Sequence, residues 1–183
     1  MTDLIPRQRS SDSDAFESLY RDVVALVRRY AARHVGDQLA DDVVAEALTA
    51  VWQKWDSLPS SAEERRAWTF GAARLAIKVV SRRHRGGLPT GLSIIRADEP
   101  SVADHADGVA ADDRVMRLLS ALPPAEFDAM WLVVWADLSP TDAARALGCS
   151  VTALTSRLAR GRRHLRERLD EQAREGEVTG RVR

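Results

Sequence analysis

Residues 141–158 read TDAARALGCSVTALTSRL, and this segment carries the most specific structural signal in the chain. Ser139 and Pro140 stand just before it as a capping hydroxyl and a first-turn proline, which predicts the start of a short helix. Gly148 is placed to end that helix in the left-handed conformation, and Ser150 is placed to cap the next one. Two helices joined by a tight glycine turn form a helix-turn-helix, whose second helix enters the major groove of DNA.

The second helix of this motif predicts one buried face and one DNA-facing face. Val151, Leu154 and Leu158 recur at helical spacing, which predicts the buried stripe. The remaining faces carry hydroxyl and guanidinium groups, which bind phosphates and base edges. We therefore predict DNA contacts for Ser150, Thr152, Thr155, Ser156, Arg157, Arg160 and Arg163. The alternative is an ordinary helical hairpin with a polar exterior.

Charge is distributed unevenly along a chain whose formal net charge is zero, with 27 basic and 27 acidic residues among 183. Residues 150–168 carry six arginines against Glu167 alone, whereas residues 87–113 carry one basic and six acidic side chains. Such asymmetry is expected when one part of a protein meets a polyanion. The alternative is a solvated helix face in an arginine-rich protein, because 25 of the 27 cations are arginine.

Helical periodicity dominates the rest of the chain. Apolar stripes predict three helices within residues 1–86 and four within residues 114–172, with a polar tail at 173–183. Residues 87–113 contain glycine, proline, serine and aspartate without a sustained period, which predicts a linker. We therefore predict an all-α fold of two small helical domains, joined by a flexible acidic linker.

Several classes of protein are excluded by residue usage. Cys149 is the single cysteine, which rules out a disulfide framework and favours a reducing cytoplasm. The longest apolar run, residues 129–136, is far shorter than the ~20 residues that span a bilayer, and residues 1–10 lack the pattern of a signal peptide. The four histidines lie far apart, and no phosphate-binding loop or nucleophile motif occurs. We expect no enzyme activity, cofactor, metal, small-molecule substrate or membrane insertion.

With these segments together, the chain resembles the extracytoplasmic-function (ECF) sigma factors of bacterial RNA polymerase. In the C-terminal half, the resemblance lies in LPPAEF at 122–127, LSPTDAARALG at 138–148 and SVTALTSRLARGR at 150–162. In the N-terminal half, it lies in FESLY at 16–20, GD at 36–37, DDVVAEA at 41–47, VWQKW at 51–55 and RAWTFGAAR at 66–74. These segments correspond to regions 2 and 4 of the family, in the family's order.

The resemblance implies a division of labour between the two halves. Residues 1–86 would be region 2, which binds core polymerase and the −10 promoter element, and residues 114–172 would be region 4, which binds the −35 element. Polymerase contacts are implied for Asp41, Asp42, Glu46 and Gln53. Contacts to the melted −10 strand are implied for Trp68, Phe70, Arg74, Lys78, Arg82, Arg83 and Arg85. An anti-sigma factor is a further candidate partner.

The sequence also departs from the family pattern at five positions. Leu75, Lys78, Ala45, Phe127 and Thr155 stand where members commonly have Asn, Asp, Gln, Arg and Lys, respectively. The first two would fall on the strand-opening surface. Two alternatives therefore stay open: a helix-turn-helix regulator that binds DNA alone, with residues 1–86 as a dimerisation or effector domain, or a sigma-like decoy that binds an anti-sigma factor or polymerase without opening promoters.

Overall fold

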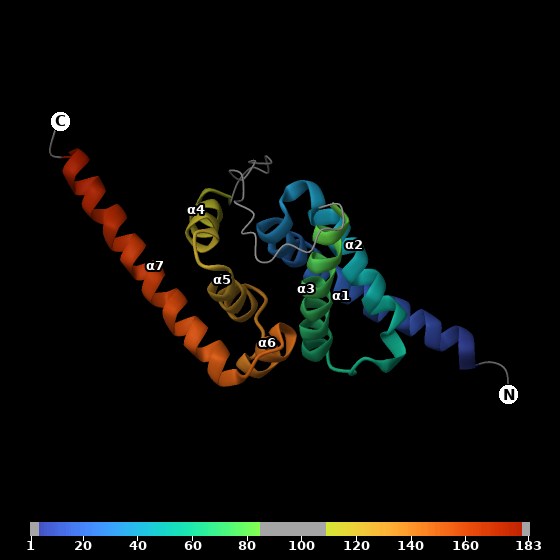
Figure 1. Cartoon of the computed structure of the whole chain (residues 1–183). Helices are drawn as coiled ribbons and strands as arrows, with labels where there is room; N and C mark the ends of the chain where they lie inside the picture. The colour runs from blue at the N-terminus through green and yellow to red at the C-terminus, as the bar shows by residue number, and fades with distance from the viewer. Residues whose placement is uncertain (1–3, 85–108, 181–183) are drawn as a thin grey trace.

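The structure is a computed structural model that describes residues 4–84 and 109–180. Within these ranges the chain is helical and has no strand, which confirms the all-α prediction (Figure 1). The elements in order are α1 (Leu4–Val35), α2 (Asp37–Gln53), a 3-10 turn η1 (Trp55–Ser57), α3 (Ala62–His84), α4 (Val109–Ser120), α5 (Pro124–Met130), a π-helical turn η2 (Trp131–Trp135), α6 (Pro140–Leu147) and α7 (Val151–Gly180). The predicted linker lies mostly outside the described residues.

Helices α1, α2 and α3 pack side by side and form what we call the N-terminal lobe. Valines fill its centre, because Val23, Val27, Val43 and Val51 are all fully buried. A tight turn at Gly36, with φ of +82°, reverses the chain between α1 and α2. Glycine adopts this backbone conformation at little cost, and other residues rarely do. The three helices predicted for this part of the chain are thus confirmed.

Helices α4 to α7 form what we call the C-terminal lobe. Its centre is the short helix α5 with the π-helical turn that follows, in which the amide of Ala136 donates to the carbonyl of Trp131 at 3.0 Å. This wider turn places Trp131 and Trp135 in a parallel stack, with ring centroids 5.8 Å apart. Helix α7 crosses α5 at Gly161, where an added Cβ would lie 3.0 Å from Cγ of Met130. The absence of a side chain at residue 161 therefore leaves room for the close approach of the two helices, and a larger residue would require Met130 to shift.

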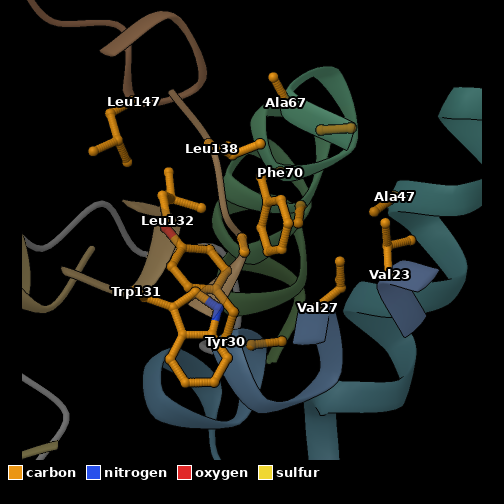
Figure 2. Close-up of a cluster of buried hydrophobic side chains, with 14 of the residues drawn as sticks. Val23, Val27, Tyr30, Ala47, Ala67, Phe70, Trp131, Leu132, Leu138 and Leu147 are labelled. Carbon is orange, nitrogen blue, oxygen red and sulfur yellow. The ribbon is translucent and has the colours of Figure 1, made fainter. Parts of the chain in front are cut away.

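The two lobes also pack directly on each other. Figure 2 shows Tyr30 and Phe70 of the N-terminal lobe in one buried cluster with Trp131, Leu132 and Leu138 of the C-terminal lobe. Helix α6 lies along the N-terminal half of α3 (Figure 1). Apolar periodicity alone did not predict this contact, since it had treated the lobes as connected through a linker. The hydrophobic core is therefore continuous across the two lobes.

No helix in the described parts of the chain is long and apolar enough to cross a membrane. Among those same residues, His, Cys, Asp and Glu side chains form no group of three that could hold a metal ion.

Candidate nucleic-acid interface

The helix-turn-helix is formed by α6 and α7, and its local chemistry follows the sequence closely. The hydroxyl of Ser139 accepts a hydrogen bond from the amide of Asp142 at 3.1 Å, and Pro140 occupies the first helical position. Gly148 ends α6 in the left-handed conformation, with φ of +63°. The hydroxyl of Ser150 then accepts from the amide of Ala153 at 3.1 Å and caps α7. Caps and turn thus fix the angle at which α7 leaves α6.

The first four turns of α7 divide into a buried and an exposed face. Leu154 and Leu158 are buried, as the sequence predicts, whereas Val151 at the helix start is exposed. Of the seven predicted DNA-contacting residues, six are exposed and Arg157 is half-buried: Ser150, Thr152, Thr155, Ser156, Arg157, Arg160 and Arg163. Gathered on one helix, they form a surface of hydroxyl and guanidinium groups, which we call the α7 face. Such groups can neutralise phosphates and read base edges in a groove.

A buried carboxylate that the sequence did not single out supports the α7 face from behind. Glu126 of α5 has a side chain only 7% exposed. Its carboxylate accepts from Nδ1 of His164 at 2.6 Å and lies 3.4 Å from Nε of Arg160. These two partners flank Gly161, the crossing point of α5 and α7. Glu126 therefore fixes the rotation of α7 about its axis and its position along α5. It also restrains Arg160, one of the predicted DNA-contacting residues.

The residues predicted to contact polymerase lie along α2. Asp41, Asp42 and Gln53 are exposed, and Glu46 is half-buried. Two of the four are engaged within the lobe: Nε of Arg28 binds Asp41 at 3.0 Å, and Arg83 forms an ion pair with Glu46. Two of the three acidic side chains in this set are thus already paired with cations of the same chain.

The residues predicted to contact the melted strand lie on α3 and fall into two groups. Lys78, Arg82 and Arg83 on its C-terminal half are exposed, while Arg85 lies outside the described residues. On its N-terminal half, Trp68 and Arg74 are half-buried, and the structure buries Phe70 to 1% exposure. The ring of Phe70 meets the edge of Tyr30, with centroids 6.0 Å apart. In this arrangement, Phe70 cannot stack on a base.

Helix α6 is what covers the N-terminal half of α3. A Cβ added to Gly71 would lie 3.8 Å from the Cα of Ala146, so the two backbones nearly touch. The guanidinium of Arg74 lies beside Gly148, where an added Cβ would be 3.8 Å from Nη1. Arg145 of α6 also lies 3.6 Å from Glu64 at the start of α3. The α7 face is therefore open to solvent, whereas half of the predicted −10 surface is covered by its own helix-turn-helix.

Comparison with protein families identifies the two lobes. Residues 16–86 match the model of sigma-70 region 2, and residues 112–165 match that of sigma-70, region 4. The chain belongs to the sigma-70 family. In this sigma factor, region 2 corresponds to the N-terminal lobe and region 4 to the C-terminal lobe, and the ECF resemblance found in the sequence is confirmed.

The solved structures similar to this sigma factor include two complexes. One is the sigma factor RpoE in complex with the anti-sigma factor NepR from Bartonella quintana, at 26% identity and a TM-score of 0.64, covering 84% of this chain and 95% of that chain. The other is CnrH in complex with the cytosolic domain of CnrY, at 24% identity and a TM-score of 0.58, covering 87% of this chain and 90% of that chain. The second likeness concerns the fold alone. No curated protein matches the chain significantly.

Proposed function

We propose that this sigma factor binds core RNA polymerase, directs it to −35 and −10 promoter elements and promotes opening of the duplex. The observation that carries the proposal is the α7 face, in which exposed hydroxyls and arginines stand on a helix fixed by two caps, a glycine turn and Glu126. A rigid helix with this surface suits the major groove of the −35 element. Residues 114–172 would thus read duplex DNA.

In the same proposal, residues 1–86 would bind polymerase through α2 and the opened −10 strand through α3. Lys78, Arg82 and Arg83 would neutralise the strand, and the aromatic rings of Trp68 and Phe70 would offer stacking surfaces once uncovered. Unstacking a base costs a few kcal/mol, which stacking and pocket contacts can offset without nucleotide hydrolysis. Residues 87–113 would act as the linker between the two regions.

Run-off transcription tests the proposal directly. The purified protein is mixed with core RNA polymerase and the DNA upstream of its own gene. We expect a transcript of defined length that neither component gives alone. Polymerase binding without a transcript would instead favour a decoy, and stable operator binding without polymerase would favour a stand-alone regulator.

The α7 face is tested with Arg157→Ala, because Arg157 forms no ion pair among the described residues. We expect weaker binding to the −35 duplex by about 1–3 kcal/mol if the guanidinium reads a base, or a salt slope reduced by about one if it binds a phosphate. Arg174→Ala, which is exposed on α7 and lies nearly five turns further along, is the control and should leave both values unchanged. If the two variants have the same affinity and the same salt slope, the first turns of α7 do not bind the −35 duplex.

We also propose an anti-sigma factor as a partner. RpoE of Bartonella quintana was solved in complex with the anti-sigma factor NepR, and its chain resembles this one over both regions. On this chain, Leu75 and Val79 of α3 are exposed at 59% and 37%, so an apolar strip is available on region 2. Leu75 stands where family members commonly have a polar residue. Co-purification with the product of a neighbouring gene tests this partner, and loss of capture by Leu75→Asn would place it on α3.

A further inference from the structure

The three arginines predicted to contact DNA from α7 differ in what holds their side chains. Arg157 forms no ion pair among the described residues. Arg163 lies 3.8 Å from Glu167, one turn further along the same helix, and both side chains are more than half exposed. Arg160 instead reaches back to α5, where Oε1 of Glu126 accepts from its Nε at 3.4 Å. Of these three side chains, only that of Arg160 is tied to another helix in the described part of the chain.

The carboxylate that holds Arg160 is itself buried and fixed. The side chain of Glu126 is 7% exposed, whereas that of Glu167 is 56% exposed. Solvent and salt screen an exposed ion pair strongly and a buried one much less. Oε2 of Glu126 also accepts from Nδ1 of His164 at 2.6 Å, so each carboxylate oxygen has its own partner. The crossing of α5 and α7 therefore sets the orientation of this carboxylate, and with it that of the Arg160 guanidinium.

The contact with Glu126 leaves the outer edge of the Arg160 guanidinium free. The bond to the carboxylate uses Nε, and neither terminal nitrogen is bonded to any residue that the structure describes. The side chain is nearly half exposed, so these nitrogens can meet a ligand from outside. Two parallel N–H donors match two adjacent acceptors, which on duplex DNA are the oxygens of one phosphate or O6 and N7 of a guanine.

We propose that Glu126 and His164 are positioning residues for DNA binding, which hold the Arg160 guanidinium in the orientation that binds two adjacent acceptor atoms of the duplex. The inference rests on the proposed DNA binding by the α7 face. A long side chain loses rotamer freedom when it binds, and a buried carboxylate that already restricts it reduces this loss. Arg160 should therefore contribute more to binding than Arg163, although the two carry the same charge.

Long-range charge and positioning predict opposite effects when the carboxylate is removed. Glu126→Gln deletes an anion close to a DNA-binding surface, so charge alone would strengthen binding to a polyanion. If the carboxylate positions Arg160, the same substitution should weaken binding by about two- to tenfold, the range expected when one long side chain must be ordered on binding. Glutamine keeps the size of the side chain and one acceptor oxygen, which limits the change in packing.

Binding to selected DNA tests the inference. The full chain selects duplexes from a pool of random sequence, and its affinity for the selected duplex is then measured. We expect weaker binding for Glu126→Gln and for Arg160→Lys, which keeps the charge but loses the planar guanidinium. Because both changes act on the same oriented group, the double variant should lose no more than the weaker single variant. Arg163→Lys is the comparison, and its effect should add to that of Glu126→Gln.

A second variant serves if Glu126→Gln does not fold. His164→Ala leaves Glu126 and Arg160 in place but removes the hydrogen bond to Oε2. We expect a loss of affinity in the same direction, with no further loss in combination with Arg160→Lys. Arg160→Ala then identifies the ligand atoms. Relaxed selectivity at one base pair indicates a guanine, weaker binding to all duplexes with a salt slope reduced by about one indicates a phosphate, and unchanged affinity would overturn the inference.

Motion of the arginine side chains tests the positioning without DNA. The order parameter of each Nε–H group is measured by nuclear magnetic resonance relaxation, which reports motion on the picosecond to nanosecond timescale. We expect a higher value for Arg160 than for Arg163 in the intact chain, and similar values for both in Glu126→Gln. Equal values in the intact chain would contradict the restraint by Glu126.

The outcomes separate this inference from the proposed function. If the intact chain selects no duplex, the α7 face does not bind DNA and both proposals fail. If it selects a duplex that Glu126→Gln binds equally well or more tightly, only the positioning role fails. Additive losses for Glu126→Gln and Arg160→Lys would also overturn that role, because Glu126 would then act on the fold and not through Arg160.

Discussion

Helices α7 and α3 are the two predicted DNA-binding elements, and they differ in how accessible their predicted DNA-contacting residues are to solvent. The α7 face is open, with its hydroxyls and arginines exposed, and it is held in place from behind by Glu126. The N-terminal half of α3 is covered by α6, and Phe70 is buried in the core shared by both lobes. The same helix-turn-helix that presents one DNA surface therefore hides the other.

The difference shows that a surface can be both a binding site and a packing site. Aromatic residues that could stack on unpaired bases are also large apolar side chains, and burying them favours a closed protein. The exposed arginines of α7 have no such alternative, because an unpaired buried guanidinium is unfavourable. Three substitutions should alter this contrast, and they follow here from the largest expected effect to the smallest.

Phe127→Ala should remove most of the difference in accessibility between the α7 face and the N-terminal half of α3. Truncating a fully buried aromatic residue costs about 3–5 kcal/mol, and here much of that loss falls on the contact between lobes. We expect a lower urea midpoint and faster amide exchange in residues 66–74 of α3, so that this surface becomes as accessible as α7. The control is Phe16→Ala, whose ring packs on Trp52 and Trp55 within region 2. An equal effect of both variants on residues 66–74 would contradict this expectation.

Ser139→Ala and Ser150→Ala compare the two helices directly, because each removes one N-cap with the same 3.1 Å hydrogen bond. The loss is typically about 1 kcal/mol for either. Ser139 caps α6, the helix that covers α3, so its loss should increase exchange in both α6 and residues 66–74. Ser150 caps α7, and its loss should leave α3 protected. Identical exchange maps for the two variants would show that α6 is not the cover.

Tyr30→Phe should have the smallest effect on stability, and the effect should be visible mainly at alkaline pH. Burial, followed by the nearby Asp128 carboxylate, raises the pKa of Tyr30 well above its ordinary value of 10.0. Because the folded pKa exceeds the unfolded one, this stabilisation is complete below pH ~10 and is lost as the pH rises towards the folded value. We expect the urea midpoint of the intact chain to fall above pH 10 more steeply than that of Tyr30→Phe. Parallel curves of urea midpoint against pH for the two proteins would show that the Tyr30 phenol is not buried in the core shared by the two lobes.

The sequence predicted much of this fold because the decisive signals were local. The caps at Ser139 and Ser150 and the turn at Gly148 depend on neighbours within four residues, and all three formed as expected. Apolar periodicity on α3 was less reliable, because Leu75 and Val79 lie at helical spacing from the buried Ala72 and Ala76 yet are exposed themselves. The stripe defines a helix face but does not specify what covers it.

The contacts that sequence reasoning missed are distant in the chain. His34 and Asp128 are separated by 94 residues, and Glu126 lies 38 residues before His164. Pairing over such distances leaves no periodic pattern in a single sequence. Glu126 did leave a weak local trace, since Arg160 and His164 lie one turn apart on either side of a glycine. The burial of Phe70 left no such trace, because the sequence assigns this residue to the melted strand and an aromatic side chain suits a core and a stacking surface equally.

The close crossing at Gly161 has a mechanical consequence. Residue 161 has no side chain, and the single carboxylate of Glu126 contacts both Arg160 and His164 on either side of it, so α5 and α7 behave as one rigid unit. Any partner that pulls α5 away from α1 must swing the far end of α7 through a wide arc. A small displacement of α5 would thereby change the orientation of the whole α7 face.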